Sequence, residues 1–116
     1  MVAEAQQAYD AFLTDVATPV TRQVAGALKA EGFPFTVSTP QSGLRLASDN
    51  GRDDYVEFAL DTAGDTPAVM GRVRRTRGSR TIEDERPVGD GRPPAALTDQ
   101  DVLMLLTGAI ETLLQR

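Results

Sequence analysis

The sequence predicts a two-layer α+β fold that consists of one long bent N-terminal helix, a five-stranded antiparallel meander sheet and a C-terminal helix. Apolar residues recur with the helical period at both ends of the chain and with the strand period of two between them. Turn residues divide the central part into short runs of strand length. A chain of 116 residues has the size of one domain, so we expect residues 1–116 to form a single α+β domain.

Residues 3–31 are expected to form the first helix, because their apolar side chains gather in one stripe along a helical surface. The members of this stripe are Ala5, Tyr9, Phe12, Leu13, Val16, Val20, Val24, Ala27 and Leu28. Pro19 interrupts the run, since it has no backbone N–H and its ring presses on the preceding turn. Either the helix is kinked there, or Thr18 caps a second helix. The stripe keeps its phase across Pro19, which favours one bent helix that stops at Gly32.

Five strands are expected in the middle of the chain, where apolar and polar residues alternate. The alternating runs comprise residues 33–38, 44–47, 55–60, 69–74 and 80–88. Turns or loops rich in Gly, Pro, Asn and Asp separate them at residues 40–43, 49–52, 61–67 and 78–79. Short connections between consecutive strands predict an antiparallel meander.

One face of this sheet is expected to be apolar and covered by the two helices. Its expected members are Phe33, Phe35, Val37, Leu44, Leu46, Val56, Phe58, Leu60, Val69, Val73 and Ile82. Because paired residues point to the same face, keeping these residues together fixes the strand register. The opposed pairs on the other face are then Arg45–Glu57, Glu57–Arg72, Arg72–Glu85 and Arg74–Glu83. The exposed face is therefore expected to carry a row of residues that alternate in charge.

The last helix is expected to run from Asp99 to about Gln115, with Thr98 as its cap. Its apolar face contains Val102, Leu103, Leu106, Ala109, Ile110, Leu113 and Leu114. Met104 and Leu105 lie outside this face and widen it. Either the whole helix is used as core, or Met104 and Leu105 form an interface that seals a homodimer or fits a partner's groove.

The most conspicuous polar cluster is a run of five arginines on the fourth and fifth strands, Arg72, Arg74, Arg75, Arg77 and Arg80. The predicted register assigns Arg72 and Arg74 to carboxylates. It leaves Arg75, Arg77 and Arg80 near the hairpin tip without obvious partners. These three residues are candidates for binding an anionic ligand, nucleic acid or an acidic protein tail, and the alternative is a charged structural surface.

Other polar groups are interpreted structurally. Glu83 and Glu85 share one face and already have arginine neighbours, and Asp84 points to the other face. Asp49, Asp53 and Asp54 surround a turn without the spacing of a calcium loop, so we expect a solvated hairpin tip. Of the two tyrosines, Tyr9 fits the helix stripe, and Tyr55 is expected on the exposed face.

The amino-acid composition of the chain excludes several classes of function. The chain has 17 acidic and 12 basic residues, a net charge of −5, and neither His nor Cys. The acidic balance argues against nucleic-acid binding over the whole surface. The missing residue types exclude disulfides, thiol or histidine catalysis and the usual zinc sites, and no cofactor is predicted. The N-terminus lacks the pattern of a signal peptide and no stretch is apolar enough to span a membrane, so we expect a cytoplasmic protein without membrane contact.

These observations favour a small acidic, non-enzymatic protein-interaction module, namely an adaptor, a chaperone-like protein or an accessory subunit that forms a homodimer. The alternative is a binder of an anionic ligand or nucleic acid through the arginine-rich hairpin 72–80. In size, acidity and order of elements the chain resembles type III secretion chaperones. That family has a helix within its strand run, whereas residues 61–67 are too few for one, so no site residue is carried over.

Overall fold

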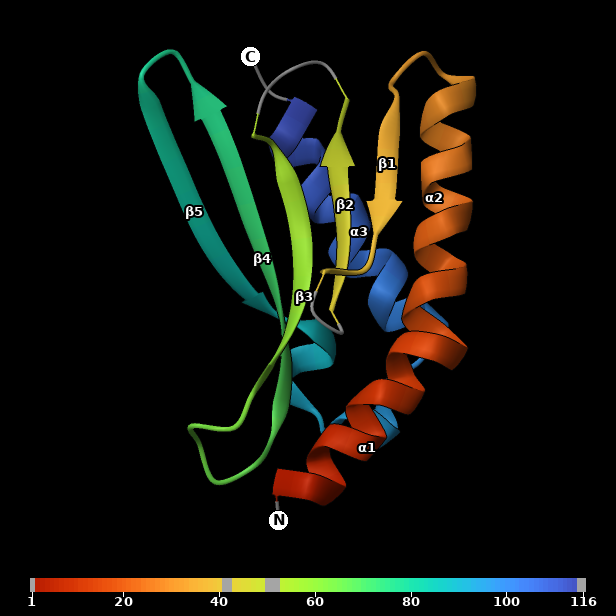
Figure 1. Ribbon diagram of the computed structural model, residues 1–116, viewed down its shortest axis with the longest axis vertical. Coiled ribbons are helices and arrows are strands. Elements are labelled where there is room, and N and C mark those ends of the chain that lie inside the picture. The colour runs from red at the N-terminus through yellow and green to blue at the C-terminus, as the bar shows by residue number, and fades with distance from the viewer. Residues whose placement is uncertain (1, 41–42, 50–52, 115–116) are drawn as a thin grey trace.

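The computed structural model describes residues 2–40, 43–49 and 53–114 and confirms the predicted α+β architecture (Figure 1). The sheet consists of β1 (Phe35–Ser38), β2 (Leu44–Ser48), β3 (Tyr55–Asp61), β4 (Ala68–Arg77) and β5 (Arg80–Pro87). The helical elements are α1 (Val2–Phe12), η1 (Leu13–Ala17), α2 (Thr18–Ala30), η3 (Val88–Gly91), η4 (Pro94–Ala96) and α3 (Asp99–Leu114). The predicted turn residues Gln41, Ser42, Asn50, Gly51 and Arg52, and Gln115, lie outside the described residues.

The N-terminal helix is one bent element, as the continuous apolar stripe predicts. A wide π-helical turn, η1, joins α1 to α2, and the Thr18 N–H donates to the carbonyl of Leu13, five residues earlier. The wide turn directly precedes Pro19, so it makes room for a ring that would press on the carbonyl four residues before it. Thr18 makes no cap, because the residues on both sides of it are helical. The helix ends at Ala30, and Gly32, which follows it, has a φ of 89°, as expected for a residue that stops a helix.

The sheet is a meander in the order β1-β2-β3-β4-β5, and every neighbouring pair is antiparallel. All four opposed pairs that the parity argument gave are present. They are Arg45–Glu57, Glu57–Arg72, Arg72–Glu85 and Arg74–Glu83. The register could be predicted because moving any strand by one residue would turn its apolar side chains away from the helices.

The helices cover the same face of the sheet, and the core lies between the two layers (Figure 1). Phe12, Phe58 and Leu106 are among its buried members. Two residues predicted for this face are exposed instead, Phe33 by 43% and Ile82 by 48%. Phe33 precedes β1, which begins only at Phe35. Ile82 points to the helix side of the sheet, but α3 packs against β3 and β4 and leaves β5 uncovered.

The start of α3 has the predicted cap. The Thr98 hydroxyl accepts a hydrogen bond from the Asp101 N–H, and the Asp101 carboxylate accepts one from the Thr98 N–H. Asp101 also pairs with Arg92, which fixes the irregular segment before the helix. In the part of the chain that the structure describes, no helix has the length and apolar character required to cross a membrane.

Candidate interaction surface

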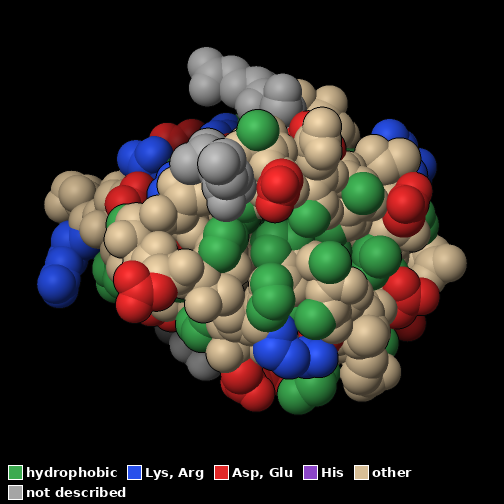
Figure 2. Space-filling model, turned by 90° about the horizontal axis from the view of Figure 1, so that it is seen from below, with side chains coloured by type: hydrophobic (Ala, Val, Ile, Leu, Met, Phe, Trp, Pro, Cys, Tyr) green, Lys and Arg blue, Asp and Glu red, His purple; other side chains and the backbone are tan. Residues whose placement is uncertain are grey.

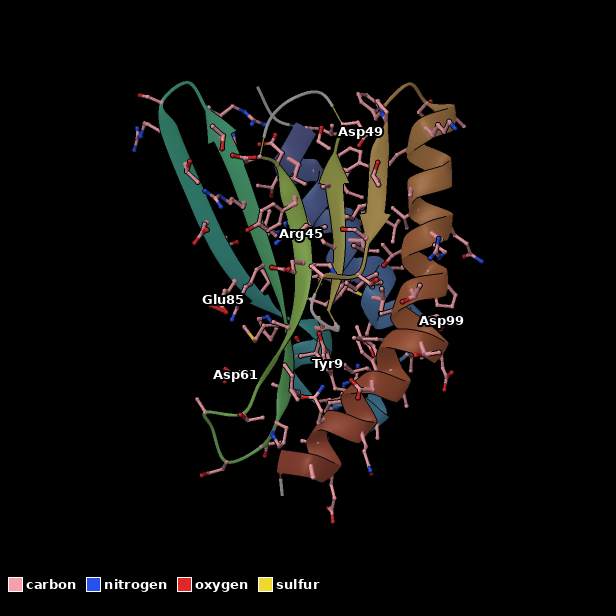
Figure 3. The ribbon with its side chains drawn as sticks, viewed as in Figure 1. Tyr9, Arg45, Asp49, Asp61, Glu85 and Asp99 are labelled. Atoms are coloured by element: carbon pink, nitrogen blue, oxygen red, sulfur yellow. The ribbon has the colours of Figure 1, made fainter. Side chains whose placement is uncertain are left out.

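The open face of the sheet carries ion pairs across neighbouring strands. The pairs are Arg45–Glu57 at 3.0 Å, Arg72–Glu85 at 3.5 Å and Arg74–Glu83 at 3.8 Å. Figure 3 labels Arg45 and Glu85, which lie on β2 and β5 of this face. Tyr55 lies partly buried between two arginines, with its ring centre 4.2 Å from the Arg45 guanidinium and 6.0 Å from that of Arg74. Each of these three arginines has a carboxylate opposite it on the neighbouring strand. Their positive charges are therefore balanced by nearby negative charges.

Arg77, one of the three candidate anion-binding residues, is held inside the protein's own structure. Its guanidinium lies 2.9 Å from Asp54 and donates a second hydrogen bond of 2.6 Å to the carbonyl of Leu113. Asp54 is only 4% exposed and also accepts a hydrogen bond from the Thr76 N–H. The expectation that Asp54 belongs to a solvated tip is therefore wrong, since this carboxylate joins β4 and α3 through Arg77.

Arg75 and Arg80 lie on the same side of the hairpin as Arg77. Arg80 stands opposite Arg77 across the two-residue turn and is exposed, and Arg75 stands opposite Ile82 and is half-buried. The register thus brings the three predicted residues to one face. The engagement of Arg77 with Asp54 leaves Arg80 as the exposed cation at the tip.

The two predicted interface residues of α3 have different environments. Met104 is 65% exposed, in agreement with a position outside the core face. Leu105 is only 8% exposed and packs on Gly71 of β4, where a methyl group in place of the glycine hydrogen would lie 2.4 Å from a Leu105 Cδ. Leu105 is therefore a core residue, and the prediction that it belongs to an interface is wrong. The missing side chain of Gly71 is the signal that α3 approaches β4 closely at this point.

The β5 edge, defined as residues 80–87, is the longest strand edge without a cover among the described residues. Every residue of β5 except Arg86 is exposed, and β5 is the last strand in the sheet order. Arg86 alone reaches α3, where it donates a 2.9 Å hydrogen bond to the Thr112 hydroxyl. The opposite edge strand, β1, has four residues and packs against α2. In Figure 1 nothing lies beyond β5 on its outer side.

A cleft of about 460 Å³ lies where α1 meets the lower ends of the central strands (Figure 3). The Tyr9 hydroxyl at this cleft is buried and has no hydrogen-bond partner among the described residues. Burial, followed by the charges of Glu57 and Asp10, raises the pKa of Tyr9 to about 12. The phenol of Tyr9 is therefore neutral near neutral pH.

The lower end of the molecule presents a different kind of surface. Seen from below, apolar side chains gather there between acidic and basic ones (Figure 2). This end is formed by α1 and by the loop between β3 and β4 (Figure 1).

Comparisons with protein-family models, with curated proteins and with solved structures found no match for this chain. Within residues 2–40, 43–49 and 53–114, no group of three or more metal-ligating side chains is close enough to hold a metal ion. Among the described residues, β5 is an exposed strand at the end of the sheet order.

Proposed function

We propose that this protein is a non-enzymatic protein-interaction module, an adaptor or accessory subunit that binds an extended protein segment along β5. The observation that carries the proposal is the exposure of β5 over almost its whole length, with the exposed apolar side chain of Ile82 at its centre. A strand added to a free edge gains backbone hydrogen bonds, and its side chains are read in alternate positions.

The geometry of the hairpin supports this mode of binding. In an antiparallel ladder, alternate residues direct their N–H and C=O groups to opposite sides of the strand. Half of the β5 backbone groups therefore bond to β4, and the other half point to the outer edge. Pro87 at the end of β5 has no N–H to donate, so a partner's hydrogen bonds are confined to the residues before it.

The composition of the open face supports a non-enzymatic role. Among the described residues, Arg45, Arg72 and Arg74 of this face pair with Glu57, Glu85 and Glu83, so these charged groups are engaged with one another. The phenol of Tyr9 is neutral near neutral pH.

A photo-reactive side chain placed at position 81 tests the proposal in the protein's own cells. Thr81 is exposed on β5, and the matched control is Thr62, which is exposed in the loop after β3. We expect defined protein adducts from position 81 and none of the same mass from position 62. Equal adduct patterns at both positions, or no adduct from position 81, would overturn the proposal.

A salt titration separates this function from anion binding by the hairpin. Binding of nucleic acid through Arg75 and Arg80 should fall steeply as the salt concentration rises, because bound counterions are released on association. The proposed strand addition depends mainly on backbone hydrogen bonds and burial of Ile82, so we expect a shallow salt dependence. A steep loss that follows Arg75→Ala with Arg80→Ala would favour the anion-binding function.

A further inference from the structure

We infer that the segment that pairs with β5 is the β5 strand of a second copy of this chain, in an antiparallel arrangement centred on Ile82. The inference rests on the proposed function and deepens it by naming the partner and the register. It is carried by the charge pattern of β5, which complements itself in this arrangement.

The hairpin turn determines which backbone groups are free. The two-residue loop Gly78–Ser79 is closed by Arg77 and Arg80, which stand opposite each other. In such a hairpin the closing pair exchanges both of its backbone hydrogen bonds. Alternation along the strand then directs Ile82 toward β4 and the N–H and C=O groups of Thr81 and Glu83 toward the outer edge.

Pairing about Ile82 uses these outward groups. Thr81 of one copy stands opposite Glu83 of the other, and both of these residues present their backbone groups to the outer edge. Ile82 then faces its own copy in a non-hydrogen-bonded pair, in which the side chains approach most closely, with Cα atoms about 4.5 Å apart. The 48% exposed side chain of Ile82 is thereby covered.

The same register pairs opposite charges. Arg80 of each copy stands opposite Asp84 of the other, on the same face as the two isoleucines. Arg80 and Asp84 are both exposed in the single chain, where Asp84 accepts a hydrogen bond from Arg86 of its own strand. One central apolar pair and two flanking ion pairs therefore form around the two-fold axis.

Other registers of the same strand are less favourable. A shift by one step toward the C-terminus opposes Glu83 with its own copy and Ile82 with Asp84. The next step in that direction opposes two copies of Asp84. A shift the other way opposes Arg80 with Ile82 and shortens the pairing. Like charges that face each other on neighbouring strands are destabilising, so the alternation Arg80, Ile82, Asp84 selects one register and disfavours pairing with unrelated strands.

Charge-swap variants test this register by sedimentation velocity up to about 1 mM protein, a range that detects weak dimers. We expect the wild type to reach 24.8 kDa, twice the 12.4 kDa of one chain. Arg80→Asp and Asp84→Arg should each weaken the dimer at least about tenfold, because each places two like-charge pairs in it. The double variant should restore the wild-type dimer, which a variant that merely misfolds would not do.

Matched controls carry the same charge changes elsewhere. Arg22→Asp and Asp65→Arg alter exposed residues outside β5 and should leave the dimer unchanged. Thr81→Pro removes an outward N–H and should give a folded monomer. A wild type that stays monomeric, single swaps that dimerise normally, or a double swap without restoration would each overturn the inference.

The outcome also separates this inference from the proposed function. A monomeric wild type whose position 81 still gives an adduct with a different protein contradicts self-pairing and leaves the interaction module standing. A monomer without any adduct from position 81 contradicts both. An adduct of 24.8 kDa, twice the 12.4 kDa chain, that is lost when Arg80→Asp is added to the chain carrying the photo-reactive group supports both.

Discussion

The carboxylate of Asp54 ties three parts of the molecule together. It directly precedes β3, accepts a 2.8 Å hydrogen bond from the Thr76 N–H of β4, and pairs with Arg77 at 2.9 Å. Arg77 in turn donates to the carbonyl of Leu113 near the end of α3. A buried charge of this kind costs free energy when its partner is removed, because the remaining group is left desolvated and unpaired.

Removal of the Asp54 carboxylate is therefore expected to destabilise the fold. We expect Asp54→Ala to lower the free energy of unfolding by about 3 kcal/mol, measured by urea denaturation. The matched control is Asp53→Ala, which truncates an exposed neighbour and should cost less than about 0.5 kcal/mol. Equal losses of unfolding free energy for the two variants would contradict a stabilising contribution from the buried pair of Asp54 with Arg77.

The contact between Gly71 and Leu105 gives a second test at the level of single residues. Gly71→Ala places a methyl group 2.4 Å from a Leu105 Cδ, so we expect a loss of about 2 kcal/mol from overpacking. Gly26 in α2 has open space where a Cβ would lie, and Gly26→Ala should stabilise the helix by up to about 1 kcal/mol. Thermal unfolding of both variants measures these opposite changes in stability. A Gly71→Ala variant as stable as the wild type would contradict the close contact with Leu105.

The predicted strand register contains enough information to bring Asp54 and Arg77 to the same face of the sheet. The predicted pair Glu57–Arg72 is present, and the same register places Tyr55 opposite Arg74. Asp54 precedes Tyr55 by one residue, so the alternation of side chains turns it to the helix side of the sheet, where Arg77 also lies. Because an acidic run beside a turn is typical of a solvated loop, the local sequence favours an exposed Asp54 over this pair. The carbonyl of Leu113 could not be foreseen, since it depends on where α3 lies across the sheet.

At the scale of the element, the first turn of α3 combines a cap with a charge. Hydrogen bonds from the Thr98 N–H, then from its hydroxyl and from Arg92, lower the pKa of Asp101 despite its partial desolvation. A carboxyl group whose pKa is lower in the folded state stabilises the protein above its unfolded pKa. That stabilisation is lost as the pH falls through the folded pKa.

Asp101→Asn is expected to test this charge at two pH values. Near neutral pH we expect a loss of about 1 kcal/mol, since the capping box and the ion pair with Arg92 are weakened. In acid, below the folded pKa of Asp101, the wild type carries a neutral carboxyl group too, and the difference should shrink. Urea denaturation of both proteins at each pH measures the difference in their free energies of unfolding. If this difference is the same at both pH values, the charge of Asp101 has no role in stability.

The elements themselves were predictable because their signals are local. The apolar stripe of the sequence continues across Pro19, and parity together with the two-residue turn at Gly78–Ser79 predicts the pairings β2–β3, β3–β4 and β4–β5, all of which are present. The π-helical turn before Pro19 has no comparable signal, and beyond it the buried face of the helix includes Thr21 and leaves Ala27 exposed. The burial of Leu105 and the exposure of Ile82 depend on the lateral position of α3, which no local pattern specifies.

At the scale of the whole molecule, the two layers have unequal widths. The helices cover β1 to β4, and the sheet continues beyond them into β5 (Figure 1). An exposed strand edge can pair with a strand of another chain, and proteins usually shorten, cover or charge such edges. The β5 edge is long and uncovered, and its charges alternate so that one register of self-pairing is favoured. The asymmetry of the layers is thus the structural basis of the proposed function.

Residue-resolved amide hydrogen exchange of dilute and concentrated protein tests the role of β5 most directly. We expect the N–H groups of Thr81 and Glu83 to exchange rapidly in dilute protein and to become protected as the concentration rises. The Thr76 N–H, which is bonded to Asp54 within one chain, should be protected at both concentrations. Rapid exchange of the outward β5 amides at every concentration would contradict pairing of this edge with a second copy.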